Sequence, residues 1–263
     1  MLREFRLYRR TIKIHLLSTL EYKGWWFMVL TVLVQCAAEP FVIVLMFHRF
    51  GGIGVWTLER ILLVYALALT SFGLAESLCR GFDYFPWHMV RTGNFDRLLL
   101  RPKSLFTQVA SSFFHIHRLA RASAGLAVTI WALTRLGVPF TLYSAAMLTA
   151  ALLGGILMYT GVFVMSSGVA FFTIKALDWI YIFTNASYQV TRMPRDHMPA
   201  LFKYLFTFFL PVLVISYYPA SAVCGWGEPS WLGWLALPSG AAFLAGSLLV
   251  WRIGVRHYKS TGS

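Results

Sequence analysis

The sequence predicts an all-α integral membrane protein with six transmembrane helices and both termini in the cytoplasm. Hydrophobic residues make up 58% and aromatic residues 17% of its 263 positions, against 13% charged residues. A soluble domain has far more charge and fewer apolar residues. Two further observations support the same fold class: long apolar segments, and an uneven distribution of lysine and arginine along the chain.

The apolar segments are long enough to cross a bilayer, which takes about 20 mostly apolar residues. Five of them are clear. A sixth, 119–136, carries Arg121 and Arg135 near its ends, where long side chains can reach the membrane surface. The membrane domain is therefore expected to cover 25–253, between an N-terminal segment 1–24 and a tail 254–263. The six expected spans are 25–47, 61–78, 119–136, 142–172, 204–223 and 231–251.

The fourth span is longer than a bilayer requires, since 31 residues form roughly 46 Å of helix. This helix must tilt, break or project from the membrane. The pair Gly154 and Gly155 offers a break, whereas Ala150 and Gly154 at a spacing of four would permit close approach of another helix.

Lysine and arginine predict the orientation, because cytoplasmic loops carry the excess of these residues. Eighteen of the 23 lie in the N-terminal segment, the gaps 80–105 and 175–203, and the residues after the last span ends at 251, which share one side if six spans alternate. The opposite side would hold only Arg49, Arg60 and Arg135. The net charge of +13 then indicates attraction to anionic lipid. No folded basic domain that could bind nucleic acid is present.

The N-terminal segment 1–24 is predicted to form an amphipathic helix lying in the membrane plane. Phe5, Tyr8, Ile12, Leu16 and Leu20 fall on one helical face, and most of the basic residues lie beside them. A simple basic anchor would explain the charge but not the apolar stripe. An interfacial helix explains both.

A short helix with its own start and stop signals is expected at 94–101, within the sequence RTGNFDRLLLRPKS. Asn94 can cap its N-terminus, Asp96 lies in the first turn, Arg101 lies in the last turn, and Pro102 ends it. Such a helix on the cytoplasmic side either docks a soluble partner or lies flat on lipid.

The apolar residues of this short helix, Phe95, Leu98 and Leu99, share one face at spacings of three and four. Arg97 and Arg101 point elsewhere. This pattern gives the helix an apolar edge and a charged edge, but composition alone leaves the two interpretations open.

Three motifs resemble a known family. They are GNFDRLLLRP at 93–102, the stretch from FLP to SYYPA at 209–220, and YKSTGS at 258–263. In order, they are similar to the permease subunits of type-2 ABC transporters, in a bacterial branch of six-span proteins. The similarity extends over essentially the whole chain.

The resemblance implies a role for several segments. The helix after span two would be a coupling helix that docks in a cleft of the nucleotide-binding subunit, and 1–24 would be the in-plane connecting helix. Residues 217–226 would form a short re-entrant element near the outer surface. The implied docking residues are Asn94, Phe95, Asp96, Arg97, Leu98, Leu99 and Arg101.

The resemblance also implies partners. The sequence contains no G-x-x-x-x-G-K-[ST] motif to cradle nucleotide phosphates, so the chain is expected to be a non-catalytic subunit without a cofactor. Two copies of a separate ABC ATPase would bind ATP and Mg²⁺. A second permease chain, identical or homologous, would complete the pathway in the bacterial inner membrane. Relatives mostly export amphipathic drugs, lipids, peptides or glycans.

Ionisable residues within spans are costly in lipid, so they are candidates for the transport pathway. Glu39, beside Pro40 in the outer half of span one, could face the dimer axis or a cation. Glu76 near the inner end of span two is expected to pair with Arg80 at a spacing of four. Lys175 and Asp178 are expected to form an interfacial ion pair after span four.

Two other function classes remain as alternatives. A membrane enzyme finds little support, because His115 and His117 lie on different helical faces without a third ligand, and no G-x-S-x-G motif occurs. An ATP-independent carrier or channel is compatible with the composition. It would usually show an internal repeat and charged midplane residues, and neither is clear.

Overall fold

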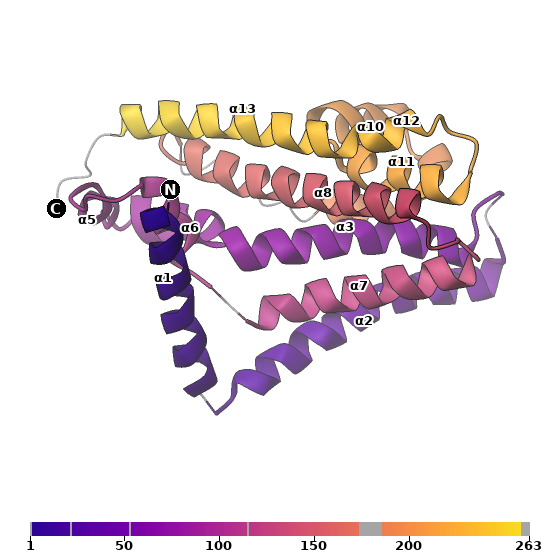
Figure 1. The fold of residues 1–263 in the computed structure, drawn as a ribbon, viewed down its shortest axis with the longest axis horizontal. Helices are drawn as coiled ribbons and strands as arrows, with labels where there is room; N and C mark the ends of the chain where they lie inside the picture. Colours follow the sequence, from indigo (N-terminus) through magenta and orange to yellow (C-terminus); the bar gives the residue numbers. More distant parts are fainter. Residues whose placement is uncertain (1, 22, 53, 115, 174–185, 259–263) are drawn as a thin grey trace.

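The computed structural model describes residues 2–21, 23–52, 54–114, 116–173 and 186–258, and its regular elements are helices. Five long helices run side by side along the longest axis of the molecule (Figure 1). They are α2 (Trp25–Phe50), α3 (Leu58–Cys79), α7 (His117–Arg135), α8 (Leu142–Val169) and α13 (Ala236–His257). The all-α class is therefore confirmed.

Four helical segments of the described chain are long and apolar enough to cross a membrane: Trp25–Arg49, Leu58–Cys79, Leu142–Val169 and Trp231–His257. The helix α7 lies alongside them but is less apolar, because its first turns carry His117, Arg118 and Arg121. A fifth apolar segment is a pair of helices with a sharp bend.

The N-terminal helix α1 (Leu2–Glu21) lies across one end of the bundle, transverse to the long helices (Figure 1). Its Tyr8 hydroxyl donates a hydrogen bond to the carbonyl of Leu78, 2.6 Å away, which fixes α1 to the end of α3. Burial, and to a lesser degree Cys79, raises the pKa of Tyr8, so this side chain remains a neutral donor.

The short helices between α3 and α7 lie at the same end of the bundle as α1 (Figure 1). They are α4 (Gly81–Phe85), the π-helical η1 (Pro86–Val90), α5 (Phe95–Leu99) and α6 (Leu105–Ala110). Tyr258, the last described residue, packs there against Phe95. We refer to this end, formed by α1, α4, η1, α5 and α6, as the basic end, and to the opposite one as the far end.

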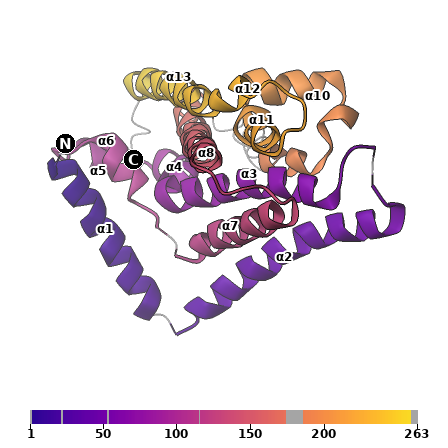
Figure 2. The same cartoon turned by 45° about the vertical axis from the view of Figure 1, so that its right-hand side comes forward.

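Helix α3 forms the centre of the bundle. It is buried over nearly its whole length and contacts α7 on one side and α8 on the other (Figure 2). By contrast, α2 is mostly exposed and packs chiefly on α7. An apolar helix with so little burial within its own chain is typical of one whose other sides contact lipid or another membrane chain.

The tightest packing joins α8 and α13, which make the most extensive helix contact in the described chain. Gly154, Gly161 and Gly168 on α8 repeat every seven residues, and each faces the backbone or a ring of α13. Gly240 returns the contact, because a Cβ there would overlap the carbonyl of Gly154. Small residues let two backbones approach closely in a membrane. The predicted close approach at Gly154 is therefore confirmed, whereas the considered break at Gly154 and Gly155 does not occur, since α8 is continuous.

The expected fifth span, 204–223, is not a single straight helix. The pair Ala200–Phe209 and Val212–Cys224 meets at an angle of 95°, because Leu210 is extended and Pro211 has no amide hydrogen to continue a helix. The pair contains α10 (Ala200–Tyr204), the π-helical η4 (Leu205–Phe209) and α11 (Val212–Cys224). With α12 (Trp231–Trp234), these elements gather at the far end (Figure 1).

The described part of the 175–203 segment also differs from expectation, since it does not lie at the basic end. Tyr188 stacks on Phe72 inside the bundle, and Asp196 accepts a hydrogen bond from the Trp56 indole in the far loop between α2 and α3, at 2.9 Å. The chain therefore passes from the basic end to the far end between Val169 and Asp196. This stretch includes η2 (Val190–Arg192) and η3 (Arg195–His197).

Candidate functional site

The short helix α5 is anchored by one aromatic side chain. Phe95 is fully buried, with ring centroids 5.2 Å from Phe85, 5.2 Å from Phe171 and 4.8 Å from Tyr258. Phe85 and Phe171 in turn contact Trp251 of α13 at 5.0 and 5.5 Å. These five rings form one cluster, which we term the aromatic anchor. It ties α5 to α4, to the chain just after α8, and to α13.

The exposed face of α5 differs from the one expected. Phe95 is 0% and Leu98 only 7% exposed, so neither is available to a partner. Leu99 is 45% exposed, and Leu100, just beyond the helix, is 86% exposed. The apolar edge predicted from the helical spacing is thus divided: its first two residues hold α5 to the bundle, and the surface is formed by Leu99 and Leu100.

The expected cap at the start of α5 is wrong. Asn94 precedes a helix that begins at Phe95 as predicted, but its side chain makes no capping hydrogen bond. Instead its amide nitrogen donates to Thr92 Oγ1 at 2.8 Å and to the His88 carbonyl at 3.3 Å. Asn94 therefore stabilises the turn between η1 and α5 rather than the helix.

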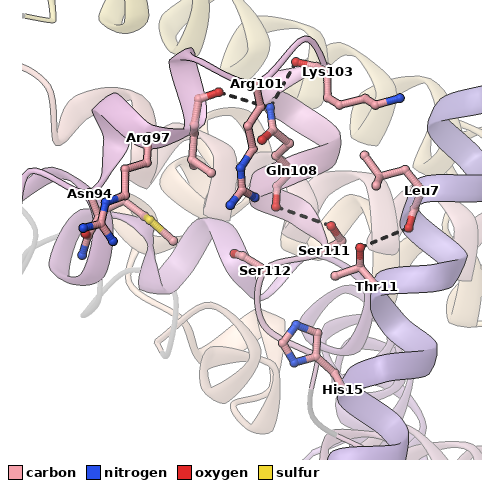
Figure 3. Close-up of a pocket in the computed structure, with 12 residues that line it drawn as sticks. Leu7, Thr11, His15, Asn94, Arg97, Arg101, Lys103, Gln108, Ser111 and Ser112 are labelled. Atoms are coloured by element: carbon pink, nitrogen blue, oxygen red, sulfur yellow. Dashed lines mark hydrogen bonds between the residues drawn. The ribbon is translucent and has the colours of Figure 1, made fainter.

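The charged residues of α5 and the following turn border a cavity of about 470 Å³ between α1 and α6 (Figure 3). Arg97 and Arg101 are exposed and make no ion pair with any other described residue. Asp96 is half-buried. Helix α5 and the turn after it therefore expose two leucines, Leu99 and Leu100, and two arginines that pair with no described carboxylate.

Glu76 is the centre of a buried charge cluster. Its side chain is 1% exposed and pairs with Arg80, as predicted from their spacing. Two further pairs were not predicted: Arg118 lies 3.0 Å and Arg121 2.9 Å from the Glu76 carboxylate. The cluster ties α7 to the end of α3, so in this chain Glu76 is enclosed by cations rather than open to a passage.

The same cluster continues to α4 through Asp83, whose carboxylate lies 3.1 Å from Arg80. Burial raises the pKa of Asp83, although Arg80 opposes the change. Burial alone would lower the pKa of Arg80, but the carboxylates of Asp83 and Glu76 outweigh it and raise that pKa. The arginine therefore stays charged and holds α4 against α3.

Glu39 lies in a second cluster, closer to the far end. It accepts a hydrogen bond from the Tyr65 hydroxyl of α3 and forms an ion pair with Arg192 of η2, at 2.6 Å. The Arg192 guanidinium also lies 5.1 Å from the ring of Tyr65. Glu39 was expected to face the dimer axis or a cation. The cation that the structure supplies is Arg192 of the same chain.

The far end is held by a third set of polar contacts. Arg195 pairs with Glu228 and lies within 5.0 Å of the Tyr217 ring and 5.2 Å of the Tyr218 ring. These contacts attach η3 to α11 and to the loop before α12. The distribution of charge along the sequence predicts the cytoplasmic side for Arg192 and Arg195. The path of the chain instead brings them to Glu39 and Glu228, away from the basic end.

Some predicted residues receive no structural test. Lys175 and Asp178, the expected interfacial pair, lie outside the described residues, as does His115. Among the residues that the structure does describe, no group of three or more His, Cys, Asp or Glu side chains could hold a metal ion.

A sequence model of the family described as "ABC-2 family transporter protein" matches residues 33–262, which is most of the chain. No curated protein and no solved structure shows significant similarity to it.

Proposed function

Because this chain belongs to the ABC-2 family of transporter proteins, whose permeases are multi-pass membrane components that work with an ABC ATPase, we propose that it is half of the translocation pathway of an ATP-driven exporter. Two ATPase copies would bind ATP and Mg²⁺, and a second permease, identical or homologous, would complete the pathway. The proposed site of action is the bacterial inner membrane, and the proposed cargo is an amphipathic drug, lipid, peptide or glycan.

We place the basic end in the cytoplasm, on the rule that cytoplasmic segments carry the excess of Lys and Arg. Correcting the path of residues 186–203 moves three cations to the far half but leaves the asymmetry intact. Among the cations that the structure describes, six lie in the far half, namely Arg49, Arg60, Arg135, Arg192, Arg195 and Lys203. The four long apolar helices would then cross the membrane, with the bent pair at 200–224 dipping into it from the outer side.

An apolar hollow at the far end supports an amphipathic cargo. It measures about 490 Å³ and lies between the bent pair and the start of α13, lined mainly by apolar side chains that include Phe208, Val214, Leu235 and Phe243. A pocket of this size and lining suits the apolar part of a small molecule or a lipid chain.

The observation that carries the coupling proposal is the division of α5 into a buried and an exposed side. Leu99 and Leu100 form an apolar surface that the described part of the chain leaves exposed, while Phe95 is fully buried in the aromatic anchor. A soluble ATPase bound to Leu99 and Leu100 would push on a helix that Phe95 holds rigidly to the bundle. Packed interiors transmit displacement because they resist compression.

The aromatic anchor gives this push a route to the membrane helices. Phe95 contacts Phe171, which follows α8, and both Phe171 and Phe85 contact Trp251 on α13. Helices α8 and α13 are joined along Gly154, Gly161, Gly168 and Gly240, a contact that we term the glycine seam, so they would move as one body. The proposed power stroke is thus a displacement of α5 that tilts the α8–α13 pair.

Affinity purification in mild detergent, followed by mass spectrometry, tests this function. The unaltered chain should recover an ATPase that carries a P-loop, and Leu99→Asp/Leu100→Asp should lose it without loss of membrane insertion. Phe140→Asp/Leu142→Asp is the matched control, because these two residues are each 89% exposed but lie at the far end. Recovery of no ATPase by the unaltered chain, from its native source, would reject the proposal.

A further inference from the structure

The cavity between α1, α5 and α6 has an unusual distribution of charge (Figure 3). Arg97, Arg101 and Lys103 line it, with His15 of α1 on the opposite wall, and no carboxylate of a described residue lines it. None of the three cations forms an ion pair with a described residue. Three like charges around one hollow repel one another, so a bound anion would lower their electrostatic free energy.

The rest of the wall offers hydrogen-bond acceptors. Ser111 and Ser112 each donate their hydroxyl hydrogen to a backbone carbonyl, at 2.8 and 2.7 Å, which leaves the oxygen as an acceptor. Gln108 is 8% exposed; its amide nitrogen donates to the carbonyls of Lys103 and Leu98, and its Oε1 has no partner. A ligand suited to this wall would bring hydroxyl donors as well as an anion.

The position of the cavity limits its occupant further. Leu7, Thr11 and His15 of α1 line it, and α1 lies across the basic end of the bundle (Figure 1). Apolar side chains of Leu7, Met89 and Leu98 also line it. This combination of cations, acceptors and apolar surface at a membrane boundary matches a lipid headgroup with its glycerol and first acyl carbons.

We propose that this cavity binds the phosphate of an anionic phospholipid whose headgroup carries free hydroxyls, with Arg97 and Arg101 on the phosphate and the Gln108 wall on the hydroxyls. The bound lipid would hold α1 to α5 from the membrane side. The site does not depend on ATPase docking at Leu99 and Leu100, since neither of these residues lines the cavity.

The test uses the purified full chain in nanodiscs, with and without phosphatidylglycerol in phosphatidylcholine. Lipid retention by native mass spectrometry and the midpoint of thermal unfolding are the two readouts. Phosphatidylglycerol should be retained and should raise the midpoint, whereas phosphatidylcholine alone should do neither. Arg97→Gln/Arg101→Gln should weaken the binding of phosphatidylglycerol by about tenfold or more, as expected for losing charge-assisted hydrogen bonds.

Two further variants make the result specific. Thr11→Trp fills the cavity from α1 without touching Leu99 or Leu100, so it should lose the lipid and keep the ATPase. Arg6→Gln/Arg10→Gln removes two exposed cations at the same spacing on α1 that do not line this cavity, and it should bind lipid as the native chain does. Equal weakening by this control would reject a specific site in favour of general surface charge.

Soluble ligands distinguish the source of the phosphate. Inorganic phosphate and glycerol 1-phosphate should produce no shift at concentrations where phosphatidylglycerol saturates. A shift of equal size from either one, abolished by Arg97→Gln/Arg101→Gln, would overturn the lipid assignment. Absence of any ATPase in the affinity purification would leave these readouts unchanged, so failure of the two proposals is separable.

Discussion

The guanidinium of Arg192 lies 2.6 Å from the carboxylate of Glu39, although 153 positions of sequence separate them. This contact joins the first long helix to a segment that follows α8, and Tyr65 of α3 completes it. Each side chain is about a quarter exposed, at 26% for Arg192 and 25% for Glu39. An isolated charge would be costly at this depth in a bilayer.

Removing one partner of this pair should therefore cost more than removing both. We expect Glu39→Gln and Arg192→Gln each to destabilise the chain by about 1–3 kcal/mol, because each leaves an uncompensated charge. The double variant should recover part of that loss. The midpoints of thermal unfolding in detergent, arranged as a double-mutant cycle, measure the coupling. Arg49→Gln, an exposed cation near the same end, serves as control; additive single effects would contradict the pair.

The path of the chain predicts that η3 is accessible from outside the cell. In a background of Cys36→Ala, Cys79→Ala and Cys224→Ala, His197→Cys should react with a membrane-impermeant maleimide in intact cells. Thr92→Cys, at the basic end, should react only after permeabilisation. Both positions are exposed, so a difference reports sidedness. Labelling in the reverse pattern would contradict the proposed orientation.

The glycine seam predicts opposite effects for one identical substitution at two positions of α13. Gly240→Ala should destabilise the chain by about 1–3 kcal/mol, because the methyl group would meet the backbone of α8, which cannot yield as a side chain could. Gly246→Ala meets nothing within 4 Å and should be neutral or stabilising by up to about 1 kcal/mol through helix propensity. Thermal unfolding of both variants decides the matter, and equal effects would show that the seam is not close-packed.

The aromatic anchor predicts that one substitution leaves ATPase binding intact but uncouples ATP hydrolysis from transport. Phe95→Ala keeps Leu99 and Leu100 exposed but removes the ring that contacts Phe85 and Phe171. Co-purification of the ATPase should persist while transport per ATP hydrolysed falls. Phe113→Ala is the control, since Phe113 is also at the basic end but contacts Tyr84 and His88 rather than Phe95. Unimpaired transport by Phe95→Ala would exclude the proposed route.

The sequence by itself determined the features that depend on composition and local periodicity. The membrane class, the helix at 2–21, the helix after Asn94, and the Glu76–Arg80 pair all follow from residues close together in the chain. Helical spacing and hydropathy act over a few turns, so one sequence carries that information without the fold. The motif at 93–102 and the match over residues 33–262 lead to the same family.

Only the tertiary structure decided which side of each helix is buried and which is exposed. Spacing placed Phe95, Leu98 and Leu99 on one edge of α5, but packing against Phe171 and Tyr258 buries the first and leaves Leu99 outside. Likewise, the charge distribution predicts a cytoplasmic position for Arg192, whereas the path of the chain after α8 brings this residue to Glu39. Helical periodicity shows which residues share a face of one helix. What covers that face depends on segments far away in the sequence, and local patterns do not specify where those segments lie.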